Sequence, residues 1–314
     1  MKTGLLYFEA ALPRTLEPSN LVGRLRTAVS AAGSPLLDLK VYEQDSKTLV
    51  ADLYYRKRLA AQLVFVRPYL EEAAAASVWE EPRQPPPGEG YKPPASPSVA
   101  IIIDDIGQKR LDFSFLNLPY DLTFSILPFT PYGAEFARRA RARGREIMVH
   151  IPMEPVDYPR INPGKGALTT IMSDYELVRQ LEEDLAQIAL AVGANNHMGS
   201  RLTQDEDAMR VVLSDLKKRG LFFVDSRTIA STVALKVAKE IGLPCIGRDL
   251  FLDHIIDEEL IRQNIAKAGS IAKKRGYAVA IGHPHLATLN ALKAELPKLK
   301  SQGIKVVPVS RLVR

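Results

Sequence analysis

The sequence predicts an α/β protein in which a small α+β module precedes a larger domain of alternating strands and helices. Three observations carry this prediction. The chain has 314 residues and 46% hydrophobic content, which suits one large and one small packed unit. A proline-rich stretch separates two regions of regular patterning. After that stretch, helical patterns repeatedly end at glycine and are followed by short apolar runs, which is typical of helix-to-strand returns.

The first 68 residues read as the small module. We expect a strand at 4–12, a helix at 19–32 capped by Ser19, and a hairpin-like pair of strands at 48–55 and 59–66. This region contains no histidine and no converging polar cluster. We therefore expect it to bind, tether or assemble rather than carry chemistry.

Residues 69–97 are predicted to be a linker. Pro85 to Pro97 includes the segments Pro-Pro-Pro-Gly and Gly-Tyr-Lys-Pro-Pro, a composition that favours extended and partly polyproline-II chain over packed structure.

Residues 98–314 are predicted to hold seven or eight β/α units, which suit a barrel or an open doubly wound sheet. Capping boxes at Ser173 with Glu176 and at Thr203 with Glu206 open two of the helices. The glycines that end the helical patterns are Gly144, Gly193, Gly220, Gly242, Gly276 and Gly303.

Acidic residues and imidazoles recur where the apolar strands end. The run from Ser98 to Ile103 stops at two aspartates, and later runs reach a histidine or an aspartate in the same way. In both candidate architectures, ligands bind at the carboxyl ends of the strands. The sequence therefore predicts a metal-dependent hydrolytic site formed among Asp104, Asp105, His150, His197, Asp225 and His283.

Five motifs in this order give a family resemblance: Asp-Asp-Ile-Gly, His-Ile-Pro-Met-Glu-Pro, Asn-Asn-His-Met-Gly-Ser, Asp-Ser-Arg-Thr and Gly-His-Pro-His. Residues 98–314 resemble the polysaccharide deacetylase (NodB-like) superfamily, and more closely its divergent polysaccharide deacetylase branch. The resemblance implies an irregular (β/α) barrel of seven or eight strands. It also implies hydrolysis of an N-acetylated glycan or polysaccharide.

The superfamily's roles transfer by position. Asp104 matches the general base, Asp105 a metal ligand, His150 the first histidine of a His-x-x-x-His ligand motif, and His283 the general acid. Glu154 stands where that motif has its second histidine, so the resemblance makes it a candidate ligand. In place of the superfamily's Arg-x-Pro-Tyr segment, this chain has the segment around His197. His197 is therefore a further candidate ligand. Candidate substrate contacts at the rim are Asn196, Ser200, Asp225, Ser226 and His285.

The expected cofactor is a divalent metal. Zinc accepts histidine and carboxylate ligands, although an additional carboxylate shifts preference toward harder metals, so manganese, nickel and cobalt are alternatives. A bound cation would lower the pKa of water and polarise the acetyl carbonyl. Asp104 would then take a proton, and His283, whose ordinary pKa is about 6.5, would deliver one to the leaving amine.

Composition excludes several other classes of protein. A net charge of +6 and an arginine-rich segment without interleaved aromatics indicate a solvated face rather than a nucleic-acid site. The single cysteine, Cys245, excludes an internal disulfide and a thiolate metal cage. No apolar run reaches the roughly 20 residues of a spanning helix. The resemblance implies a periplasmic or cell-envelope location in bacteria, whereas no signal peptide is visible, which leaves the cytoplasm open.

Two alternative functions stay open beside the deacetylase. The missing arginine and Glu154 favour a catalytically silent carbohydrate- or envelope-binding protein on the same barrel. The scaffold also suits an amidohydrolase acting on a non-sugar amide. At the level of single residues, Asp104 and Asp105 could cap the following segment, and His150 and His197 could each be core histidines. The sequence does not indicate an oligomeric state.

Overall fold

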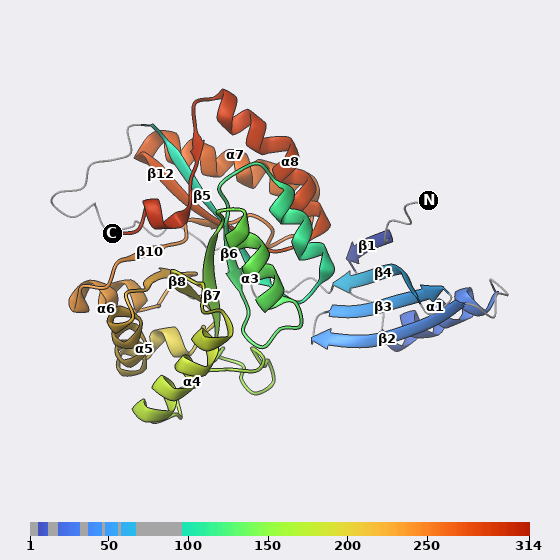
Figure 1. Ribbon diagram of the computed structural model, residues 1–314, viewed down its shortest axis with the longest axis horizontal. Helices are drawn as coiled ribbons and strands as arrows, with labels where there is room; N and C mark the ends of the chain where they lie inside the picture. Colours follow the sequence, from blue (N-terminus) through green and yellow to red (C-terminus); the bar gives the residue numbers. More distant parts are fainter. Residues whose placement is uncertain (1–5, 12–17, 32–36, 46–47, 56–57, 67–95) are drawn as a thin grey trace. The chain divides into compact units, whose positions relative to one another are not determined.

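The computed structural model describes residues 6–11, 18–31, 37–45, 48–55, 58–66 and 96–314 (Figure 1). The chain divides into two compact units, and each is treated by itself. The domain limits at 1–68, 69–97 and 98–314 stay predictions. The predicted linker lies outside the described residues, apart from its last two positions.

The N-terminal unit is a four-stranded sheet with one helix. The strand order is β1-β4-β3-β2, with β1 parallel to β4 and the other pairs antiparallel. Strand β2 was not predicted, although its alternation of apolar and polar residues is typical of a strand. The helix begins one residue before Ser19, which therefore lies inside it. The elements are β1 (Leu6–Ala11), α1 (Pro18–Ala31), β2 (Leu37–Asp45), β3 (Thr48–Tyr55) and β4 (Arg58–Val66).

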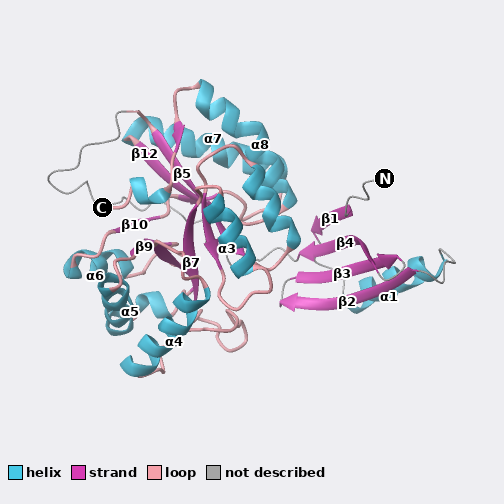
Figure 2. Ribbon diagram, viewed as in Figure 1, coloured by secondary structure: helices cyan, strands magenta, loops and turns pink. Residues whose placement is uncertain are grey.

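The C-terminal unit is built on a parallel sheet with the order β10-β9-β8-β7-β6-β5-β12-β11, and a short ninth strand, β13, also pairs with β5 (Figure 2). Every pairing in this sheet is parallel. The strands are β5 (Ser98–Ile106), β6 (Thr123–Ile126), β7 (Glu146–Met153), β8 (Gly193–Met198), β9 (Phe222–Asp225), β10 (Cys245–Gly247), β11 (Leu250–Phe251), β12 (Tyr277–Gly282) and β13 (Lys305–Val306).

One continuous segment joins the two ends of this sheet. Only Arg248 and Asp249 separate β10 from β11. The Arg248 N–H donates to the carbonyl of Asp225 at 3.0 Å, and the Asp249 N–H donates to the carbonyl of Val279 at 2.8 Å. Strands β9 and β12, each next to one end of the sheet order, therefore bond to neighbouring residues, which requires the sheet to curl. The fold is the irregular (β/α) barrel that the sequence predicted.

Helices cover the outside of the curled sheet, and α7 and α8 lie side by side (Figure 1). Strand β5 is buried on both faces, and Val99 through Ile103 have no exposed surface. This burial explains its unbroken apolar run, since each isoleucine contributes about 1.5–3 kcal/mol when buried. The helices are η1 (Arg110–Asn117), α3 (Gly133–Ala142), α4 (Asp174–Gln187), η2 (Leu202–Gln204), α5 (Glu206–Lys218), α6 (Ala234–Ile241), α7 (Glu258–Arg275), α8 (Leu286–Ser301) and η3 (Val309–Arg311).

Several local predictions need correction. Strand β7 continues to Met153, so His150 lies within the strand rather than just beyond it. Gly193 begins β8 and does not end a helix. The capping box at Thr203 is wrong because Thr203 belongs to η2 and donates its hydroxyl to the carbonyl of Gly199; Asp205 caps α5 instead. The capping box of Ser173 with Glu176 is confirmed.

Among the helices in the described part of the chain, none has the length and apolar character needed to cross a membrane.

The capping box of α4 yields a stability prediction. Ser173 accepts from the backbone N–H of Glu176, whose carboxylate in turn accepts from the Ser173 N–H at 2.8 Å. Ser173→Ala should therefore lower the free energy of unfolding by about 1 kcal/mol, measured by urea denaturation. Ser270→Ala, at an exposed position inside α7, is the control and should be neutral or slightly stabilising. Equal effects of the two substitutions would contradict the capping role.

Candidate active site and metal centre

Three side chains from strands β5, β7 and β8 converge at the carboxyl end of the barrel. Asp105 Oδ1 lies 3.2 Å from His150 Nε2 and 2.9 Å from His197 Nδ1, and the two imidazole nitrogens are 3.2 Å apart. Ligands bound to zinc at about 2.0–2.1 Å in tetrahedral geometry are separated by about 3.3 Å. The three atoms are therefore spaced as the ligands of one small cation would be.

The end of β5 explains how two consecutive aspartates reach the same site. Neighbouring side chains in a regular strand point to opposite faces. Here the pairing of β5 with β6 shifts between Ile103 and Ile106, and Asp105 adopts a φ of 55°. As a result Asp104 Oδ2 also lies 3.6 Å from His150 Nε2.

Gly107 supports this turn. Its φ is 115°, and an added Cβ would lie 2.2 Å from Thr130 Oγ1, so the position requires glycine. The Gly107 N–H donates to the buried Asp112 carboxylate at 2.7 Å. This contact ties the chain that leaves the two aspartates to η1.

Strand register brings the β7 and β8 residues together. His150 pairs with Asn195, and His197 follows on the same face of β8 two residues later. Asn195 is fully buried, and its Oδ1 lies 2.7 Å from His150 Nδ1 while its Nδ2 donates to both oxygens of Asp104 at 2.9 and 3.0 Å. The sequence interpretation did not single out Asn195.

The charges of the site favour a cation. Burial and the neighbouring Asp105 raise the pKa of Asp104, and this outweighs nearby histidines and a hydrogen bond from Asn195. Burial would also raise the pKa of Asp105, but the charge of His197 and contacts with His150 hold it well below its ordinary value. Burial would lower the pKa of His150, yet the two aspartates raise it. A positive charge is therefore stabilised where the three ligand atoms meet.

The donor set fits a divalent metal. Asp105 Oδ1 is buried and receives no well-aligned hydrogen bond from the described residues, although both imidazoles lie beside it. Two imidazole nitrogens and one carboxylate oxygen form a three-ligand set of the kind that catalytic zinc sites use with a fourth, open position.

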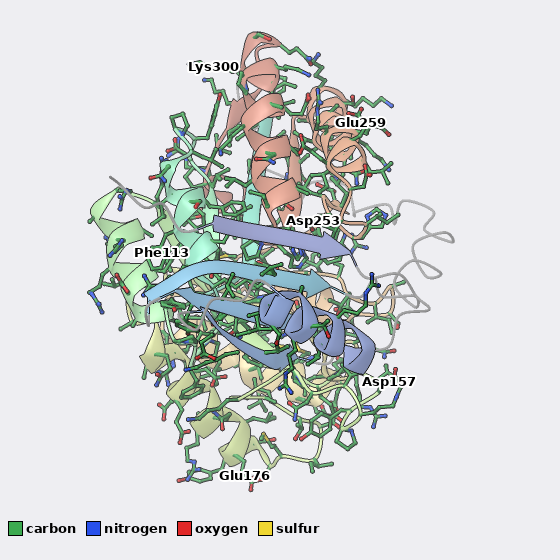
Figure 3. The ribbon with its side chains drawn as sticks, turned by 90° about the vertical axis from the view of Figure 1, so that its right-hand side faces the viewer. Phe113, Asp157, Glu176, Asp253, Glu259 and Lys300 are labelled. Carbon is green, nitrogen blue, oxygen red and sulfur yellow. The ribbon has the colours of Figure 1, made fainter. Side chains whose placement is uncertain are left out.

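His283 stands at the end of β12 and is paired with an acid that the sequence did not reveal. Its Nδ1 lies 2.8 Å from Asp253 Oδ1, and its backbone N–H donates to Asp253 Oδ2 at 2.6 Å. Asp253, labelled in Figure 3, lies between β11 and α7 and also accepts from Thr288 at 2.6 Å. Burial would lower the pKa of His283, but Asp253 and the more distant Asp105 and Asp104 raise it to about 10.

Glu154 is buried but directed elsewhere. Its Oε2 accepts from the N–H and hydroxyl of Thr170 at 2.6 and 2.8 Å, and its Oε1 lies 3.6 Å from Arg201 Nε. The group of three ligand atoms does not include it. Glu154 therefore anchors the loop between β7 and α4, and the ligand set that we propose below does not include it.

The predicted substrate contacts occupy varied positions. Ser226 Oγ lies 3.1 Å from Asn195 Nδ2 and thus borders the site, while Asn196 accepts from the Ser226 N–H and donates to the carbonyl of Met198. Asp225 accepts from Arg227 and Thr232. Ser200 accepts from the Val156 N–H, and His285 precedes α8 with its ring 6.2 Å from that of His283.

Two bacterial proteins resemble this chain in sequence. An uncharacterized protein of Haemophilus influenzae is 35% identical over 221 residues, 70% of this chain and 78% of that protein. The uncharacterized protein YibQ of Escherichia coli is 35% identical over 196 residues, covering 62% of this chain and 61% of that protein. The chain thus spans less than two thirds of the Escherichia coli relative.

A solved structure and a family model agree with the fold. The crystal structure of an uncharacterized protein from Agrobacterium tumefaciens superimposes with a TM-score of 0.67 at 27% identity, over 72% of this chain and 92% of that one. Residues 101–313 match the model of the divergent polysaccharide deacetylases. This match agrees with the curled parallel sheet and with the aspartates and histidines that converge at its edge. The chain belongs to the divergent polysaccharide deacetylase family.

Proposed function

We propose that the protein is a metal-dependent hydrolase that removes an acetyl group from an N-acetylated glycan or polysaccharide. The observation that carries the proposal is the meeting of Asp105, His150 and His197 within ligand spacing, with Asp104 beside them. Membership of the family supports carbohydrate as the substrate class. A glycan of the bacterial cell envelope is the polymer that we favour, which would require a periplasmic or envelope location.

Each residue has a distinct task in the proposed reaction. A divalent cation held by Asp105, His150 and His197 supplies Lewis acidity, which lowers the pKa of water and polarises a carbonyl oxygen. Asp104, whose pKa burial raises, accepts a proton from the attacking water. His283 is held by Asp253 at Nδ1, so Nε2 is the nitrogen that delivers a proton to the leaving amine.

We favour zinc as the metal because two imidazoles and one carboxylate make up the ligand set. Manganese, nickel and cobalt are the alternatives. Each of the four metals can be added separately to metal-free protein. The rate of acetate release from chitin and peptidoglycan fragments would then rank the metals by the activity that they support. A non-sugar acetamide in the same panel separates a glycan deacetylase from a general amidohydrolase.

The two aspartates should separate metal binding from turnover. Asp104→Asn should keep bound metal and lower the rate of acetate release by about 10²–10⁴-fold, because it removes the base. Asp105→Asn should lose the metal as well. Metal content measured by elemental analysis, alongside acetate release, tests both variants. Full turnover in Asp104→Asn would contradict its role as base.

The ligand set makes a second prediction about metal content. His150→Ala and His197→Ala should each lose most bound metal, whereas Glu154→Gln should retain it, because Glu154 binds Thr170 and approaches Arg201. His254→Ala, at an exposed histidine, is the matched control. If Glu154→Gln lost the metal and His197→Ala kept it, Glu154 would be the ligand in place of His197.

The pairing of His283 with Asp253 predicts a pH dependence. Because the pKa of His283 is raised to about 10, its imidazole is protonated at neutral pH and loses the proton as pH rises through that value. Asp253→Asn removes the charge that raises the pKa, so deprotonation should move to lower pH. NMR titration of the metal-free protein and the alkaline limb of the pH–rate profile measure this shift.

Asp207→Asn, on the exposed first turn of α5, is the control and should leave the His283 titration in place. An unchanged titration in Asp253→Asn would show that Asp253 does not set the protonation of His283.

A further inference from the structure

Asn195 connects several polar residues of the site by hydrogen bonds. It is fully buried on β8 and contacts residues from four other strand ends. Its Oδ1 accepts a hydrogen bond from the hydroxyl of Ser125 at 2.5 Å and lies 2.7 Å from His150 Nδ1. Its Nδ2 donates to Asp104 and approaches Ser226 Oγ at 3.1 Å. Both the carbonyl oxygen and the NH₂ group of the amide therefore have hydrogen-bonding partners.

The chemistry of these partners determines how the amide is oriented. An ionised carboxylate can only accept hydrogen bonds, so the NH₂ group must face Asp104 and the carbonyl oxygen must face His150. A carbonyl oxygen can only accept. His150 Nδ1 must therefore carry a proton, so in the neutral imidazole that binds a metal the lone pair is on Nε2, the nitrogen 3.2 Å from Asp105 Oδ1.

The same amide holds Asp104. Both carboxylate oxygens lie within 3.0 Å of Asn195 Nδ2, so a neutral donor orients the base. Because the donor carries no charge, it directs the carboxylate without adding a cation beside the metal ligands.

We propose that Asn195 is a positioning residue that acts on both halves of the site, fixing the His150 tautomer that presents Nε2 to the metal and orienting Asp104 as the base. This inference rests on the proposed deacetylase for its second half only. The effect on His150 concerns metal binding and holds for any reaction that the site performs.

Asn195→Asp separates the two effects. The substitution preserves size and still offers an oxygen to His150 Nδ1, and a carboxylate in that place strengthens a histidine ligand. The other oxygen now meets Asp104, where repulsion or a shared proton removes the free base. Zinc affinity, measured by calorimetry on metal-free protein, should equal or exceed that of the wild type, while acetate release should fall by about 10²-fold or more.

Asn195→Leu removes both interactions at similar volume. It should weaken zinc binding by about 10–100-fold, as other losses of contacts to metal-ligating histidines do. Circular dichroism reports whether this variant folds; if it does not, Asn195→Asp alone decides. Asn290→Asp, which adds the same charge on α8 outside the site, is the control and should match the wild type in both measurements.

Three results would overturn the inference. Weakened zinc binding by a folded Asn195→Asp would exclude the effect on His150, and so would unchanged zinc binding by a folded Asn195→Leu. Wild-type turnover in Asn195→Asp would exclude the effect on Asp104. If the wild-type protein binds zinc but releases no acetate from any glycan, the proposed function fails, and the zinc affinities still test the effect on His150.

Discussion

Two carboxylates on consecutive residues, one fully buried and the other partly exposed, cannot both be ionised unless positive charge lies beside them. Asp104 and Asp105 create this constraint at the end of β5, and the histidines around them provide groups that can carry positive charge. Burial raises the pKa of Asp104. In the other three groups neighbouring charges and hydrogen bonds outweigh burial, so that the pKa of Asp105 is lowered and those of His150 and His283 are raised. His283, with its pKa raised to about 10, carries positive charge at neutral pH, and a divalent cation would balance the two aspartates more fully.

The curl of the sheet makes this cluster of charges possible. Residues 245–252 pass from one end of the sheet order to the other, so β11 and Asp253 come to lie beside β12 and His283. In a flat sheet with the same strand order, β12 would follow β5 on the side away from β7 and β8. Curling brings ligands from β5, β7 and β8 and the candidate acid from β12 to one rim.

Much of this could be predicted from sequence because it depends on local patterns. The apolar run before Asp104 and the glycines after helices predicted a barrel or an open sheet of alternating strands and helices, and the family resemblance implied the barrel. The placement of His150 and His197 at predicted strand ends predicted the converging imidazoles. Asn195 was missed because a neutral amide carries no chemical signal of its own, and its role follows from its register with His150. Asp253 was missed because it follows a two-residue strand. Thr203 was misassigned because a short 3-10 turn moves the helix start to Asp205.

The position of a bound ion tests the central claim most directly. A crystal of the protein soaked in zinc and measured at the zinc absorption edge would locate the metal by anomalous scattering. We expect one ion about 2.0–2.2 Å from a carboxylate oxygen of Asp105, His150 Nε2 and His197 Nδ1. An ion held by Glu154 in place of His197, or no ion among these three side chains, would contradict it.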